Sequence, residues 1–74
     1  MSGFAGMVER ELHSARGAHV PMTSVHEAYA VIYEELDEFW GLVRQREHNK
    51  ETMLKELVQT AAMCQRAAED LKLL

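Results

Sequence analysis

Cysteine and proline each occur once in these 74 residues, and glycine occurs only four times. The single cysteine, Cys64, excludes a framework of intramolecular disulfides. One proline and few glycines, with 47% hydrophobic residues, argue against disorder and favour helices. A chain this short buries only about 60% of its unfolded surface, so its core is marginal without a disulfide, a metal or a partner. A bound metal or oligomerisation is therefore expected.

Basic residues are also scarce, with 8 Lys and Arg against 12 Asp and Glu and a net charge of −4. No stretch concentrates Lys and Arg on one face, so we expect no binding to nucleic acid. No run approaches the roughly 18 apolar residues of a membrane span, and the first residues lack the basic end of a signal peptide. The composition predicts a cytoplasmic protein without a membrane partner.

The hydrophobic periodicity predicts an all-α fold in a single domain over residues 1–74. Three helices are expected, over about residues 2–16, 24–46 and 49–71, and no strand pattern occurs. The two later helices are joined by a short turn, so they should form an antiparallel hairpin. The predicted architecture is a helical hairpin or bundle of about three helices.

Helix ends have recognisable signals. Gly17 is a plausible residue to end the first helix. Ser24 followed by Glu27 is a capping-box pattern that starts the second helix, so Glu27 has a structural role that competes with a catalytic one. Asn49 is a good N-cap for the third helix.

The second helix carries more apolar surface than one small partner can cover. Its apolar stripe, which we expect to be buried, contains Val25, Ala28, Tyr29, Ile32, Leu36, Phe39, Trp40 and Val43. The third helix presents an apolar row of its own, made of Met53, Leu57, Ala61, Cys64, Ala68 and Leu71. Large exposed apolar patches usually mark association sites. The bundle is therefore expected to be completed by oligomerisation.

Five of the twelve carboxylates lie between Glu27 and Glu38, and no Lys or Arg occurs between Arg16 and Arg44. The second helix cannot neutralise this charge with its own i,i+4 ion pairs. A divalent cation is the simplest external group that would offset the repulsion.

Two pairs of oxygen ligands can converge across the predicted hairpin. Glu35 and Glu38 are three residues apart on the second helix, and Glu56 and Gln59 have the same spacing on the third. Mg²⁺ prefers oxygen ligands and leaves positions for water and phosphate. A cation site and a merely solvated acidic face are both consistent with this pattern.

The segments Glu34-Glu35-Leu36-Asp37-Glu38 and Glu56-Leu57-Val58-Gln59 resemble the EExxE…ExxD signature of the MazG-like, all-α nucleoside triphosphate pyrophosphatases. The resemblance covers about residues 24–71 and includes short, phage-type members. It implies a helical homodimer or homotetramer that binds Mg²⁺, or Mn²⁺ in its place. It also implies hydrolysis of a (d)NTP to the monophosphate and pyrophosphate.

Carried over by position, the resemblance implies that Glu35, Glu38 and Glu56 are metal ligands and that Glu34 is an acidic residue of the catalytic site. The last aspartate of the signature falls on Gln59, which offers a neutral carbonyl oxygen in place of a carboxylate.

The side chains that could contact the nucleotide substrate are less clearly marked in the sequence than the metal ligands. Tyr33 and Trp40 are available for the base and sugar, and Lys55 for phosphate, although core, interface and surface roles are the alternatives. Two functional interpretations follow. One is a Mg²⁺-dependent nucleotide pyrophosphohydrolase, and the other is a non-catalytic helical oligomer or binding module that has lost full metal competence.

Overall fold

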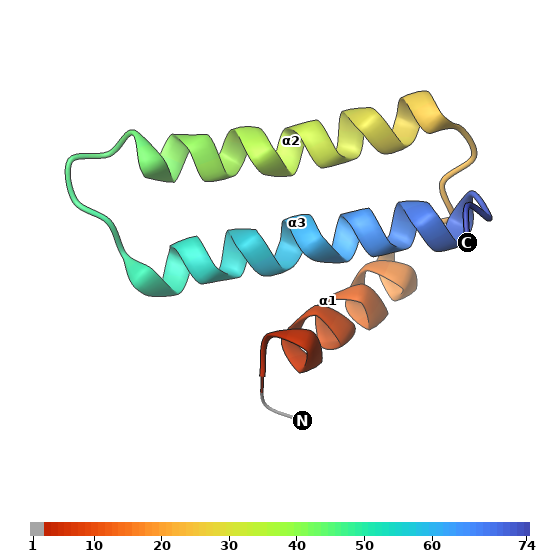
Figure 1. Ribbon diagram of the computed structural model, residues 1–74, viewed down its shortest axis with the longest axis horizontal. Helices are drawn as coiled ribbons and strands as arrows, with labels where there is room; N and C mark the ends of the chain where they lie inside the picture. Colours follow the sequence, from red (N-terminus) through yellow and green to blue (C-terminus); the bar gives the residue numbers. More distant parts are fainter. Residues whose placement is uncertain (1–2) are drawn as a thin grey trace.

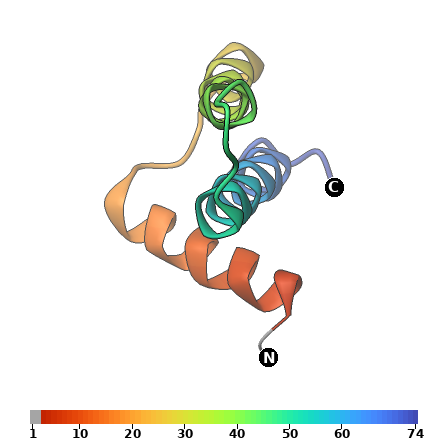
Figure 2. The same cartoon turned by 90° about the vertical axis from the view of Figure 1, so that its left-hand side faces the viewer.

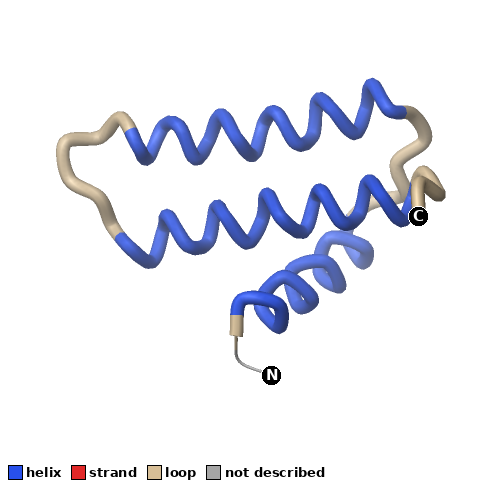
Figure 3. Tube along the Cα trace, viewed as in Figure 1, coloured by secondary structure: helices blue, strands red, loops and turns tan. Residues whose placement is uncertain are grey.

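Three helices form the structure, as the periodicity predicts. The computed structural model describes residues 3–74, with α1 over Phe4–Ala18, α2 over Val25–Val43 and α3 over Lys50–Asp70 (Figure 1). Within these described residues there is no strand (Figure 3). The all-α prediction is confirmed. No helix in this part of the chain has both the length and the apolar composition needed to cross a bilayer.

α3 is the central element of the fold. α2 and α3 run antiparallel as a hairpin, and α1 crosses α3 on the side away from α2 (Figures 1 and 2). α3 packs against both other helices, whereas α1 and α2 do not pack against each other. This layered arrangement leaves an open groove between α1 and α2, with α3 as its floor.

The starts of α2 and α3 follow the predicted capping chemistry. The Ser24 hydroxyl accepts a hydrogen bond from the Glu27 amide at 3.0 Å, and the Glu27 carboxylate accepts from the Thr23 amide at 2.8 Å. The Asn49 side chain accepts from the Glu51 and Thr52 amides. These bonds satisfy amide donors that have no partner within the helix.

Other helix ends differ from the prediction. Gly17 lies inside α1, which continues to Ala18, so its expected role as the terminating residue is wrong. The predicted start of this helix at Ser2 falls outside the described residues. α2 ends at Val43 rather than at residue 46, and His48 donates through Nε2 to the Val43 carbonyl at 2.8 Å. That bond occupies a terminal carbonyl that a further turn of helix would otherwise have used.

The core lies mainly between α1 and α3. Its buried residues are Val8, Leu12, Ala15, Met22, Ala28, Val58, Ala62, Met63 and Ala67. Ala28 is the one residue that α2 adds to this set. The predicted burial of the α2 stripe is therefore wrong within a single chain, because Tyr29 is 70% exposed and Leu36 and Trp40 are each 55% exposed. Cys64, on the apolar row of α3, is also exposed.

An ion-pair network around Asp70 joins α1, the α1–α2 connection and α3. It lies at the C-terminal end of α3, away from the turn between α2 and α3. Asp70 accepts from Arg16 of α1 at 2.7 Å and from the Met22 amide at 2.9 Å, and it lies 3.5 Å from the Arg66 guanidinium. Arg66 is buried and also donates to the Val20 carbonyl at 2.8 Å. The network fixes the α1–α2 connection against α3, and thereby sets where α1 stands beside the groove.

Candidate metal centre

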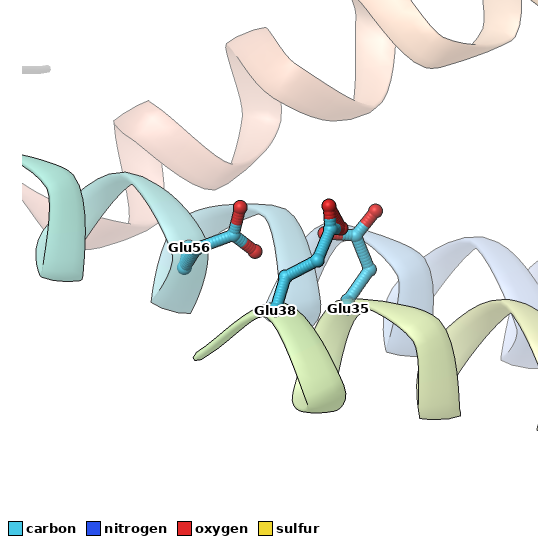
Figure 4. A group of neighbouring side chains, drawn as sticks. All are labelled: Glu35, Glu38 and Glu56. Carbon is cyan, nitrogen blue, oxygen red and sulfur yellow. The ribbon is translucent and has the colours of Figure 1, made fainter. Parts of the chain in front are cut away.

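Three carboxylates from two helices meet at one point of the hairpin. Glu35 and Glu38 come from α2 and Glu56 comes from α3. One oxygen of each lies within 4.8 Å of an oxygen of the others. Figure 4 shows the three carboxyl groups close together, with Glu35 and Glu38 reaching from α2 toward the level of α3, which carries Glu56. The i,i+3 spacing and the antiparallel pairing together account for this convergence.

Two of the six oxygens in this cluster are buried without a partner. Glu35 Oε2 and Glu56 Oε2 are both inaccessible to solvent, and no N–H or hydroxyl group of the described residues donates a hydrogen bond to either of them. Glu38 is exposed. Burying a carboxylate oxygen without a partner costs free energy, and a proton or a cation is needed to offset that cost.

The electrostatics agree with this geometry. Loss of hydration raises the pKa of Glu35 to about 7, helped by a hydrogen bond with Glu56 and by the negative charges of Glu38, Glu56 and Glu34. Loss of hydration also raises the pKa of Glu56, although the hydrogen bond from Glu35 works in the opposite direction. Below about pH 7 the metal-free protein therefore retains a proton on Glu35, beside the carboxylate of Glu56.

The cluster opens into the groove between α1 and α2, which has a volume of about 600 Å³. Glu35, Glu38, Glu34 and Gln59 all line it. Gln59 thus shares a surface with two of the carboxylates, as its spacing from Glu56 predicts. Glu38 lies in the C-terminal half of α2 and Arg66 in the C-terminal half of α3, so in the antiparallel hairpin they line opposite parts of the groove.

The structure does not bring the three substrate candidates into this groove. Tyr33 packs against Tyr29, with ring centroids 6.1 Å apart, in a separate shallow depression of α2. Trp40 is half exposed and does not line the groove. Lys55 lies in a neighbouring depression between α1 and α3, and from there its charge lowers the pKa of Glu56.

Some residues of the groove could not be identified from the sequence. Glu11 and Ser14 of α1 form its opposite wall, but no motif marks them, because their position depends on how α1 crosses α3. The ion pair between Arg66 and Asp70 could have been predicted from the sequence, since the i,i+4 spacing of these residues on α3 favours such a pair.

The donor set fits a hard divalent cation. Carboxylate oxygens from three side chains are within reach of one small ion, and the two buried oxygens lack any other partner. Oxygen ligands of this kind suit Mg²⁺ and Mn²⁺. Gln59 could add a neutral carbonyl oxygen, which would leave the ion less tightly held than a fourth carboxylate would.

Comparisons of the chain with protein-family models, with curated proteins and with solved structures found no match.

Proposed function

We propose that this chain binds Mg²⁺, or Mn²⁺ in its place, through Glu35, Glu38 and Glu56, with Gln59 at the edge of the site. The observation that carries the proposal is the pair of buried oxygens, Glu35 Oε2 and Glu56 Oε2, to which no N–H or hydroxyl group of the described residues donates. On a merely solvated acidic face, both oxygens would be in water. A cation between the two helices would replace the proton on Glu35 and satisfy both oxygens.

We further propose that the site hydrolyses nucleoside triphosphates to the monophosphate and pyrophosphate. Support comes from the resemblance of the two acidic segments to the MazG-like signature and from the groove that leads to the cluster. When bound, the cation would neutralise phosphate charge and the charge that develops in the transition state.

The side chains of the chain itself would position the attacking water. The exposed carboxylate of Glu34 lines the groove beside Glu35, where it can accept a hydrogen bond from an attacking water and take up its proton. Glu11 and Ser14 of α1 line the opposite side of the groove. Since Tyr33 and Trp40 lie outside this groove, contacts from them to a base or sugar would require a different surface or a second chain.

The proposed function includes a cellular location and an oligomeric state. A homodimer or homotetramer in the cytoplasm is the form that the resemblance implies, and the exposed apolar side chains of α2 are consistent with association.

Release of pyrophosphate from a panel of (d)NTPs, with Mg²⁺ or with chelator, tests this function. We expect Mg²⁺-dependent release by the wild type and loss of release in Glu38→Gln. Asp37→Asn is the matched control, because it removes the same charge from the neighbouring, exposed position of α2, outside the groove. Activity in chelator, or equal loss in both variants, would contradict the proposal.

A second candidate, a binding module without turnover, is favoured by the charges of the groove. Glu11, Glu27, Glu34 and the cluster contribute negative charge, and Arg66, the basic residue in the lining, is already paired with Asp70. Together with the neutral Gln59, this leaves little positive charge for a triphosphate. Under this alternative, the chain would keep its helical fold and release no pyrophosphate from any (d)NTP, even with millimolar Mg²⁺.

A further inference from the structure

The buried core reaches only one half of the α2–α3 hairpin. α3 contributes buried residues from Val58 onward, and in α2 Ala28 is buried while Ile32 packs against the core. By contrast, none of residues 33–57 is buried. Residues 33–49, here called the distal arm, are the C-terminal half of α2 and the turn that follows it, at the left of Figure 1.

Packing alone holds the distal arm weakly. Its best-covered side chains, such as Phe39 and Leu42, are only half-buried, so each stabilises the folded chain less than a fully buried side chain does. A helical segment this short is marginal in water without tertiary packing. We therefore expect the arm to open at a lower cost in free energy than the core does.

Charge opposes closure of the arm as well. The arm contains four carboxylates, Glu34, Glu35, Asp37 and Glu38. Its first basic residue is Arg44, beyond the end of α2. The three ion pairs within residues 3–74 join α1 to α3 or lie within α3, and none of them includes a residue of α2. Closing the arm on α3 therefore brings its carboxylates up to Glu56 without a salt bridge to offset them.

The carboxylate cluster is the polar link between the arm and α3. Glu35 and Glu38 belong to the arm, and Glu56 belongs to α3. If these three side chains share one cation, their mutual repulsion is replaced by attraction to a common ion. Opening the arm separates the ligands, so an ion that binds the closed form and not the open form stabilises the closed form.

The position of the arm also determines whether the groove is complete. Three residues with which α2 lines the groove, Glu34, Glu35 and Glu38, lie on the arm. Ala15 and Met63 line the groove from the core. An open arm would therefore remove this acidic part of the wall and leave the parts formed by α1 and α3 in place.

We propose that the distal arm of the metal-free chain opens from α3 while α1 and residues 58–70 stay folded, and that Glu35, Glu38 and Glu56 hold the arm closed when they share a cation. Closure completes the groove, so cation binding precedes the binding of any ligand that contacts the acidic wall. Such a ligand would in turn tighten the binding of the cation. The inference rests on the proposed metal site and adds a conformational role that the site would not have in a rigid hairpin.

Amide hydrogen exchange, followed residue by residue by NMR, tests this role. In chelator, the amides of residues 37–43 should exchange about tenfold or more faster than those of residues 62–67, which open only with the core. The dissociation constant of Mg²⁺ is measured on the same protein by titration calorimetry. Mg²⁺ at about 100 times that constant should slow exchange in the arm by up to about 100-fold, because the arm must release the ion to open.

Two variants of neighbouring residues provide the comparison. Glu38→Gln should lose most of the slowing by Mg²⁺, because it removes one carboxylate of the cluster. Asp37→Asn removes the same charge from an exposed position of the arm outside the groove, so it should keep the slowing. Equal slowing in both variants would overturn the inference.

The same measurements separate the arm from the metal site. If calorimetry shows Mg²⁺ binding but arm and core exchange at equal rates in chelator, the hairpin opens as one unit, and this inference fails while the metal site stands. Exchange in the arm that is unchanged by bound Mg²⁺ has the same meaning. Exchange that slows with protein concentration instead of Mg²⁺ would assign closure to a second chain and overturn the inference. Absence of Mg²⁺ binding would overturn the metal site and the inference together.

Discussion

Glu35 of α2 and Glu56 of α3 face each other across the hairpin, and each buries one carboxylate oxygen to which no N–H or hydroxyl group of the described residues donates. Like charges at this distance repel, and a proton retained on Glu35 relieves that repulsion when no metal is bound. The retained proton has consequences for stability and for metal binding.

The first prediction concerns the dependence of stability on pH. The pKa of Glu35 is raised from 4.5 to about 7 on folding, so the folded chain holds a proton that the unfolded chain releases. Its contribution to stability is complete below about pH 4.5 and is lost as the pH rises through about 7. In chelator, urea unfolding should show a stability loss on the order of 1–2 kcal/mol over this window, after allowance for partial solvent screening.

Glu35→Gln should remove most of that decline, because the amide stays neutral at every pH in the window. Glu51→Gln, at an exposed position in the first turn of α3, should keep it. A decline of the same size in Glu35→Gln would show that another group is responsible.

The second prediction concerns the cation. Millimolar Mg²⁺ should raise the melting temperature relative to chelator, because the ion binds the folded cluster and not the unfolded chain. Calorimetry of Glu38→Gln should show little of this rise, while Asp37→Asn should show the wild-type rise. Identical melting of the wild type with Mg²⁺ and with chelator would count against the site.

The third prediction concerns Gln59, which lines the groove with Glu35 and Glu38. Gln59→Asp should tighten Mg²⁺ binding in titration calorimetry, because a carboxylate interacts with a divalent cation far more strongly than a neutral amide does. The same variant should be slightly less stable in chelator, since a fourth carboxylate adds repulsion. Unchanged affinity would mean that Gln59 does not reach the ion.

Glu56→Ala is the opposite change to Gln59→Asp, because it removes a carboxylate from the cluster where Gln59→Asp adds one. It removes one of the three converging carboxylates, so it should lose Mg²⁺ binding and with it any turnover. Retained Mg²⁺ affinity in Glu56→Ala would exclude α3 from the site.

The fourth prediction concerns the ion-pair network around Asp70, which holds the α1–α2 connection against α3. Asp70→Asn should lower the free energy of unfolding by about 2 kcal/mol or more, because it removes a charged partner from the buried Arg66 and weakens the acceptor for the Met22 amide. Glu69→Gln is the control. Glu69 is exposed and pairs with Arg16 at the surface, so its loss should matter much less in urea unfolding.

Acid should weaken the same network. Hydrogen bonds from Arg16 and from the Met22 amide hold the pKa of Asp70 below its usual value of 3.8. The contribution of Asp70 to stability is therefore present above about pH 3.8 and is lost as the pH falls through the lower, folded value. This window lies below that of Glu35, so the two effects are separable in one pH series.

Much of this protein follows from local sequence. The three helices, the caps at Ser24 and Asn49, and the antiparallel hairpin depend on periodicity and on side chains a few residues apart. The convergence of Glu35, Glu38 and Glu56 followed as well, because two i,i+3 spacings on neighbouring antiparallel helices leave few other arrangements. The cation itself, the reaction and the oligomer stay predictions.

Tertiary structure decided which apolar residues are buried and what surrounds the carboxylates. The sequence marks Tyr29, Leu36 and Trp40 as apolar, but it does not say whether the same chain or another covers them. Because α1 packs on α3 and not on α2, these side chains stay exposed and the groove stays open. The raised pKa of Glu35 has the same origin, since it depends on the hydration that Glu35 loses beside α3 and on the charge of Glu56, which is 21 residues away along the chain but adjacent in the fold.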